Sequence, residues 1–126
     1  MKKDEKMENR QGEKVMAKEL KEIEDEYYKG FGKDGLKYDE GKLLMSLVDP
    51  LYVEDIARVL TYGAKKYTAN SWQNVEDAER RYKDALLRHT SEYLKGIELD
   101  EESGLTHLSH MATNIMFLSH FNRKAN

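Results

Sequence analysis

The sequence predicts an all-α fold, a small helical bundle. Apolar residues recur at the three-and-four spacing of amphipathic helices in several segments of the chain. Proline occurs once, at Pro50, and most of the eight glycines lie within residues 30–41 and 96–104, so long helices fit between these two stretches. No segment combines strand alternation with hairpin-turn residues, and the 126 residues are the length of one domain.

The N-terminal part divides into a charged start and a helix. Residues 1–12 hold almost no apolar side chains, which predicts a disordered segment. Residues 13–29 are expected to form an amphipathic N-terminal helix, because one narrow apolar stripe runs through Met16, Leu20, Ile23 and Tyr27. Such a stripe needs a partner surface, which is either the rest of the same domain or a second subunit.

Residues 30–126 are expected to form one helical domain. The four glycines of residues 30–41 predict a loop, followed by a short helical stretch around residues 42–48. Three longer helices are predicted: one from Pro50 to about Tyr67, one over about 77–94 that Gly96 ends in a left-handed cap, and one over 105–121, with a loop over 70–75. The last of them is apolar on most faces and is predicted to be the most buried.

The composition excludes several classes of site. Because cysteine is absent, the chain has no disulfide, thiolate nucleophile or cysteine-ligated metal. The formal net charge of -3 provides no basic field for nucleic acid or for an anionic membrane. No apolar run approaches the roughly 20 residues of a membrane span. We therefore expect a soluble, cytoplasmic protein whose partner is a small molecule.

Polar side chains share faces of the last two predicted helices. On the earlier helix they are Arg81, Arg88 and Glu92, with His89 beside them; on the later one they are His107, His110 and Asn114. Antiparallel helices joined by a short loop bring both sets together, and the loop adds Asp100 and Glu102. Such a set suits a divalent metal, magnesium in particular. The plainer alternatives are hydrogen-bonded core histidines, an intrahelical Arg88–Glu92 ion pair and a solvated acidic loop.

Basic and aromatic residues supply the other parts of a nucleotide site. The candidate phosphate-binding cations are Lys65, Lys66, Arg81 and Arg88, together with Lys37 and Lys42 of the glycine-rich segment. The candidates for stacking on a base are Trp72, Tyr38, Tyr62 and Tyr67. Tyrosine also commonly packs in a core or at its rim, so that alternative stays open for each of them.

A series of short motifs runs in order over about residues 36–121. The motifs are Lys37-Tyr38-Asp39 with Gly41-Lys42, Gly63-Ala64-Lys65-Lys66-Tyr67, Asn70 with Trp72, Arg81-Tyr82, Asp84-Ala85, Arg88-His89, and Asp100-x-Glu102-Ser103-Gly104 leading into His107-Leu108 and His110. In this series the chain resembles the dATP/dGTP diphosphohydrolase N-terminal family, found widely in phages and related to the MazG-like all-α nucleotide pyrophosphohydrolases. The resemblance implies a MazG-like helical fold that forms homo-oligomers.

The resemblance also implies a reaction and the residues for it. A purine deoxynucleoside triphosphate would be hydrolysed to the monophosphate and pyrophosphate with Mg²⁺ or Mn²⁺. The expected substrate-binding residues are Lys37, Tyr38, Asp39, Lys42, Lys65, Lys66, Tyr67, Asn70, Trp72, Arg81, Arg88, His107, His110 and Asn114. The expected catalytic residues are Glu92, His89 and Asp100, and the expected metal ligands are Glu92, Asp100 and Glu102. MazG-like enzymes typically hold magnesium with Glu-x-x-Glu and Glu-x-x-Asp pairs, whereas this chain has His89-x-x-Glu92 at the first place.

These observations leave alternative functions open. The first is a metal-dependent nucleotide pyrophosphohydrolase. The second is a non-catalytic protein that binds and sequesters a signalling nucleotide, for example in phage counter-defence, because few carboxylates accompany the basic and aromatic positions. A structural or interaction role, favoured by the charged N-terminal helix, is a third. A phage-encoded chain of either nucleotide-binding kind is expected in the host cytoplasm.

Overall fold

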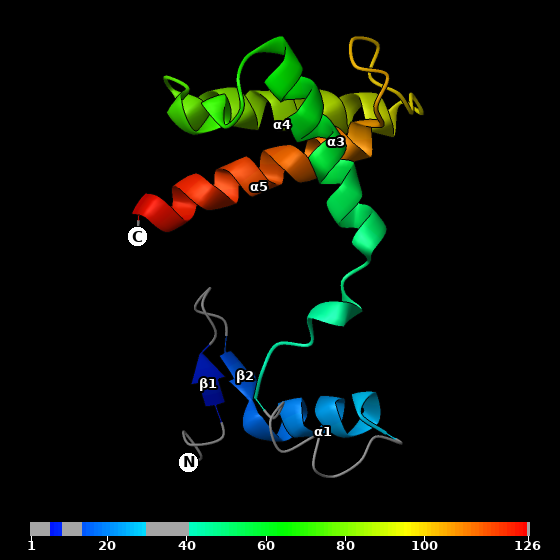
Figure 1. Cartoon of the computed structure of the whole chain (residues 1–126), viewed down its shortest axis with the longest axis vertical. Helices are drawn as coiled ribbons and strands as arrows, with labels where there is room; N and C mark the ends of the chain where they lie inside the picture. The colour runs from blue at the N-terminus through cyan, green and yellow to red at the C-terminus, as the bar shows by residue number, and fades with distance from the viewer. Residues whose placement is uncertain (1–5, 9–13, 30–40, 126) are drawn as a thin grey trace. The chain divides into compact units, whose positions relative to one another are not determined.

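The computed structural model describes residues 6–8, 14–29 and 41–125. The chain forms two compact units, Met1–Met45 and Ser46–Asn126. Four α-helices account for most of the described residues (Figure 1), which confirms the predicted all-α fold class. The MazG-like arrangement stays a prediction. Within the described ranges, no helix is both long enough and apolar enough to cross a membrane.

The N-terminal unit corrects two predictions. Strands β1 (Lys6–Glu8) and β2 (Lys14–Met16) pair antiparallel, with Met7 opposite Val15, although no strand was expected and β1 falls in the segment predicted to be disordered. Helix α1 (Ala17–Tyr27) therefore begins after residue 16 rather than at 13. β-Branched residues such as Val15 favour extended backbone, and pairing satisfies the backbone polar groups that face the partner strand.

Helix α1 buries the carboxylate of Glu24, while Leu20 and Tyr27 of the predicted apolar stripe are half-buried. Glu24 is buried, whereas Ile23 is 49% exposed. The Glu24 Oε2 atom accepts a hydrogen bond from the backbone N–H of Gly41 at 3.1 Å, and this bond offsets part of the cost of burying a polar group.

Three helices build the second unit. They are α3 (Pro50–Lys66), α4 (Ala78–Leu94) and α5 (His107–Ala125), with the 3₁₀ turns η2 (Met45–Leu47) and η3 (Ser71–Asn74). Helices α4 and α5 lie side by side, and α3 crosses α5 (Figure 1). The stretch predicted as a short helix around 42–48 thus contains a 3₁₀ turn, and so does the loop predicted over 70–75. Asp49 caps α3 by accepting the Leu51 N–H at 2.9 Å, with Pro50 in the first helical position.

The link between α4 and α5 fixes where α5 begins. Gly96 takes the predicted left-handed conformation, with φ of +87°. A bridge between Leu99 and Thr106 then closes the link, and the Asp100 N–H donates to the Leu105 carbonyl at 2.7 Å. Thr106 caps α5, since its Oγ1 accepts the Ser109 N–H at 3.1 Å.

Helix α5 is the most buried helix of those described, as predicted, but its buried face is largely polar. The buried polar residues on it are His107, Ser109, His110, Thr113 and Asn114, beside the apolar Ala112 and Phe117. Leu108 and Ile115, by contrast, are each 50% exposed. The expectation that apolar faces would be buried is therefore wrong for these two residues, because the polar side chains find hydrogen-bond partners inside the unit.

Replacing Thr106 with alanine should lower the free energy of unfolding by about 1 kcal/mol, because the first turn of α5 loses its cap. Thr61→Ala is the matched control, since the Thr61 hydroxyl only donates to the Ala57 carbonyl on the exposed side of α3. The control should cost nothing or stabilise slightly, because alanine is the better helix former. Urea unfolding followed by circular dichroism measures both; equal losses would contradict the capping role.

Candidate functional site

A cavity of about 890 Å³ opens within the second unit. This volume lies within the range of small-molecule sites. Its walls come from α3, η3, α4 and α5, and its polar and aromatic lining includes Lys66, Tyr67, Asn70, Trp72, Arg81, Tyr82, Arg88, His89, His110 and Asn114. Nine of these residues were singled out from the sequence; Tyr82 was noted there only as part of a motif.

Several predicted binding residues lie elsewhere. Lys65 faces a shallower hollow of about 400 Å³ with Glu54, Arg58 and Tyr62. Lys42 is exposed in the N-terminal unit. Lys37, Tyr38 and Asp39 fall outside the residues that the structure describes. His107 is buried and contacts the cavity-lining His89 instead of lining the cavity itself.

The aromatic residues of the cavity differ in how free their ring faces are. Trp72 stacks on Phe117, with ring centroids 4.7 Å apart, and the carbonyl of Trp72 accepts the Tyr82 hydroxyl at 2.9 Å. Trp72 is thus partly committed to packing. Tyr67 is 66% exposed, with the Lys66 ammonium 5.2 Å from its ring centroid. Tyr67 is therefore the better placed of the two to stack on a base.

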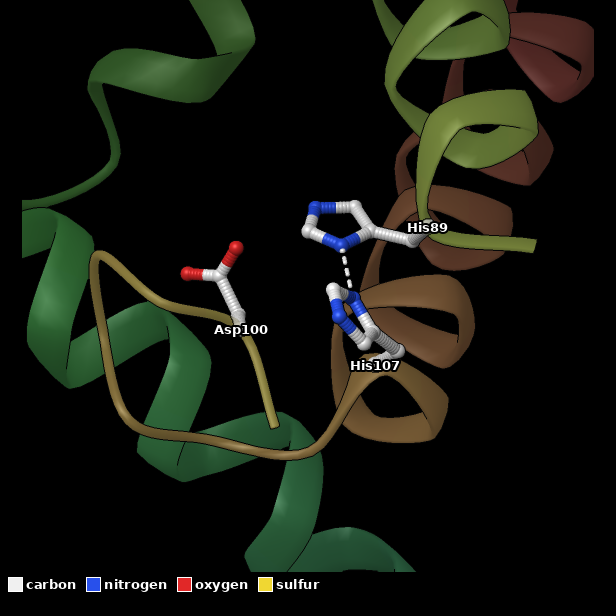
Figure 2. Close-up of side chains that lie close together, drawn as sticks. All are labelled: His89, Asp100 and His107. Carbon is white, nitrogen blue, oxygen red and sulfur yellow. Dashed lines mark hydrogen bonds between the residues drawn. The ribbon is translucent and has the colours of Figure 1, made fainter. Parts of the chain in front are cut away.

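Three histidines meet at the end of the helix pair. The Nδ1 atoms of His89, on α4, and His107, at the start of α5, are 2.8 Å apart and share a hydrogen bond (Figure 2). The ring of His110 lies parallel to that of His89, at 4.4 Å between centroids. Because α4 and α5 pack side by side, residues 18 and 21 positions apart in the sequence form one imidazole cluster.

Asp100 approaches this cluster from the loop before α5 (Figure 2). Its Oδ2 atom accepts two hydrogen bonds from Ser103, at 2.9 Å from the N–H and 2.8 Å from the hydroxyl. Ser103 Oγ also lies 2.7 Å from His110 Nε2. Ser103 was predicted only as part of a motif, although a serine three residues after an aspartate is a recognisable turn pattern.

The predicted metal set of Glu92, Asp100 and Glu102 is not gathered into one group. Glu92 pairs with Lys95 at 2.5 Å, and Glu102 pairs with Lys66. Among the described residues, one group of three potential ligands has donor atoms that all lie within 4.8 Å of one another, and it consists of His89, Asp100 and His107. Asp100 is thus the one member of the predicted set that belongs to it.

The comparisons with known proteins agree with this arrangement of motifs. Residues 32–126 match the family described as dATP/dGTP diphosphohydrolase, N-terminal. The chain belongs to this family. A protein named dATP/dGTP diphosphohydrolase, from Salmonella phage PMBT28, is 42% identical over 84 residues, which are 67% of this chain and 28% of that protein. The chain therefore spans less than a third of this relative's length. No solved structure matched the chain.

Burial is the main influence on the pKa values of His89 and His110 in this family member. Burial first, and then the neighbouring His110, lower the pKa of His89 from 6.5 to about 4. Burial likewise lowers the pKa of His110. Burial raises the pKa of Asp100, but the hydrogen bonds from Ser103 outweigh it, so the net shift is downward. At neutral pH the cluster therefore consists of a neutral His89, a neutral His110 and an ionised Asp100.

The hydrogen bond from Lys95 lowers the pKa of Glu92. The hydrogen bond from Lys66 lowers the pKa of Glu102 and, in turn, Glu102 raises that of Lys66. Both glutamates are therefore ionised and already paired with a cation, which distinguishes them from Asp100.

The lowered pKa of His89 predicts a loss of stability in mild acid. Unfolded chain takes up a proton at about pH 6.5, whereas the folded ring resists it until about pH 4, so stability is complete above pH 6.5 and falls toward pH 4. One pKa unit corresponds to about 1.4 kcal/mol, and solvent screening of this half-buried ring reduces the expected loss to about 1–2 kcal/mol.

Thermal unfolding between pH 7 and pH 5, with a chelator present, measures this loss. His89→Gln should flatten the dependence of Tm on pH in this interval, because glutamine does not titrate. A slope as steep in the variant as in the wild type would contradict the assignment to His89.

Proposed function

We propose that this chain binds a purine deoxynucleoside triphosphate and takes part in its hydrolysis to the monophosphate and pyrophosphate. The observation that carries the proposal is the cavity of about 890 Å³, in which three cationic side chains, four aromatic rings and the imidazoles of His89 and His110 border one space. The name of the phage relative, dATP/dGTP diphosphohydrolase, supports the choice of purine deoxynucleotides and of this reaction.

The cations of the cavity suit the triphosphate. Arg81 and Arg88, both exposed on α4, form no ion pair with any residue in the described ranges, so their guanidinium groups are available to phosphate oxygens. Lys66 lies on the opposite wall, on α3, and is held by Glu102. Cations on two walls would steady both the bound triphosphate and the pyrophosphate that leaves.

Water attacks the α-phosphorus in such a hydrolysis, and the bond to the β-phosphate breaks. A divalent ion, when bound, would supply charge compensation and a more acidic water. Neutral His89, which lines the cavity, and ionised Asp100 beside the histidine cluster are two groups able to accept a proton there. Glu92, one helical turn beyond His89, remains a candidate for orienting water.

Because nucleotides of this kind are cytoplasmic, the proposal includes a cytoplasmic location.

The exposed apolar residues of α4 and α5 support a homo-oligomer. Leu87 and Leu94 are 65% and 76% exposed, and their spacing of seven places them on one stripe of α4. Leu108 and Ile115 repeat that spacing on α5. A second copy of the chain that covered both stripes would remove these side chains from water.

Light scattering coupled to gel filtration should therefore give a mass of at least two chains. Replacing Leu87 and Leu94 together with lysine should shift the mass toward that of one chain, because two buried charges oppose association. A wild-type protein with the mass of one chain at all accessible concentrations contradicts this part of the proposal.

A second candidate function is sequestration of a nucleotide without hydrolysis. The observation that favours it is the engagement of Glu92 and Glu102 with lysines, which leaves few free carboxylates beside the phosphates. Such a protein would keep the cavity and its cations while releasing no pyrophosphate. A signalling nucleotide is the class of ligand that this alternative implies.

Pyrophosphate release from dATP and dGTP, with pyrimidine nucleotides as the comparison, tests the proposal. Arg81→Gln should lower kcat/KM by about 10- to 100-fold, as loss of a charge-assisted phosphate contact does. Arg80→Gln is the matched control, because Arg80 is the adjacent residue but pairs with Asp77 and Asp84 and does not line the cavity.

Equal effects of the two arginine substitutions would contradict the placement of the substrate. No pyrophosphate from any nucleotide, together with tight nucleotide retention that Arg81→Gln weakens, would replace hydrolysis with sequestration. A protein that no nucleotide stabilises in a thermal shift assay would exclude both functions.

A further inference from the structure

We propose that His89, Asp100 and His107 bind a divalent transition-metal ion in preference to magnesium. Each residue offers one ligand atom, and these atoms lie within 4.8 Å of one another. The three come from separate elements, α4, the loop before α5, and the first residue of α5 (Figure 2). The proposal deepens the proposed function, since it names the kind of metal that the hydrolysis would use.

The chemistry of the donors carries the preference. Magnesium takes oxygen ligands in octahedral geometry and is usually held through carboxylates, waters and phosphates. Two imidazole nitrogens and one carboxylate oxygen instead suit manganese, iron, cobalt or zinc, with further positions left for water or phosphate. The residues present therefore do not fit the magnesium site that the resemblance to MazG-like enzymes implies.

The distance between the Nδ1 atoms of His89 and His107 is close to that between two nitrogen ligands of one metal ion. Two nitrogens bound to one tetrahedral zinc at 2.0–2.1 Å lie about 3.3 Å apart. The Nδ1 atoms of His89 and His107 are 2.8 Å apart in the hydrogen-bonded pair, so a small opening of the pair admits an ion. One ring then moves its proton from Nδ1 to Nε2, and both lone pairs face the metal.

Outer contacts orient these ligands as they do in metal sites. Ser103 fixes the Oδ2 atom of Asp100 through two hydrogen bonds. His110 extends this support, because its Nε2 lies 2.7 Å from the Ser103 hydroxyl and its ring stacks on His89. Supporting hydrogen bonds of this kind typically change metal affinity by about 10- to 100-fold.

The position of the group connects the metal to the substrate. His89 is both a member of the group and part of the cavity wall, so an ion held there lies beside the space proposed for the phosphates. Glu92 and Glu102 are paired with lysines, which leaves Asp100 as the carboxylate of the group. One carboxylate and two neutral rings leave the ion a net positive charge toward phosphate.

Metal binding to untagged, chelator-treated protein without nucleotide tests the proposal. Calorimetry should show one equivalent of Zn²⁺, Mn²⁺ or Co²⁺ per chain, and Co²⁺ should give the visible absorption of a nitrogen-ligated ion. Mg²⁺ should bind at least tenfold more weakly. His89→Gln and His107→Gln should each weaken Co²⁺ binding by more than tenfold and change its spectrum.

His120→Gln is the matched control, because His120 is the remaining histidine, lies on the same helix as His107 and is outside the group. This variant should bind metal as the wild type does. Ser103→Ala keeps all three ligands and should weaken binding by about tenfold. It therefore tests the site even where a histidine variant fails to fold.

Metal affinity unchanged in His89→Gln, His107→Gln and Ser103→Ala, or lost only in Glu92→Gln, would overturn the proposal. So would wild-type protein that binds Mg²⁺ as tightly as Zn²⁺ and Mn²⁺. Metal binding without pyrophosphate release would leave this site standing and remove the hydrolysis. Hydrolysis that Mg²⁺ sustains in a His89→Gln, His107→Gln double variant would remove this metal site and leave the proposed hydrolysis standing.

Discussion

Hydrogen bonding along the buried face of α5 is the constraint on which the second unit depends. Thr113 is fully buried and donates to the Ser109 carbonyl at 2.8 Å, and the Asn114 amide donates to the His110 carbonyl at the same distance. Both bonds lie within α5, so the placement of the helix is set by His107 and His110, which pair with His89 on α4 and with Ser103 of the preceding loop. Sliding or rotating α5 would separate these pairs and leave buried polar atoms without partners.

The two ends of α5 differ in their contacts: aromatic side chains pack at its C-terminal end, and the histidine cluster lies at its N-terminal end. Toward its C-terminus, Phe117 stacks on Trp72 and contacts Tyr82, which closes one wall of the cavity. Toward its N-terminus, His107 and His110 find their partners on α4 and in the preceding loop. The cavity lies along α5 between these ends, so two of the polar residues that make the helix difficult to bury, His110 and Asn114, also border the candidate site.

Local patterns allowed the helices of the second unit to be predicted, because periodicity and capping residues such as Pro50 and Gly96 act over a few neighbours. They could not show which face of α5 points inward, since the partners of His107 and His110 come from distant segments. Arg81 and Arg88, which the resemblance implies as substrate-binding residues, both line the cavity. Glu92 was predicted as a ligand from its helical position, but the nearby Lys95 engages it, and such a choice between partners depends on side-chain geometry.

Trp72 offers the most direct measurement of the central claim, that the cavity between α3, α4 and α5 holds the nucleotide. It is the chain's one tryptophan and lines the cavity, so its indole N–H gives a single, assignable NMR signal. Titration with a non-hydrolysable dATP or dGTP analogue should shift this signal saturably, with the same Kd that calorimetry gives. An indole signal that stays unchanged while calorimetry reports saturable binding would place the nucleotide elsewhere and contradict the account.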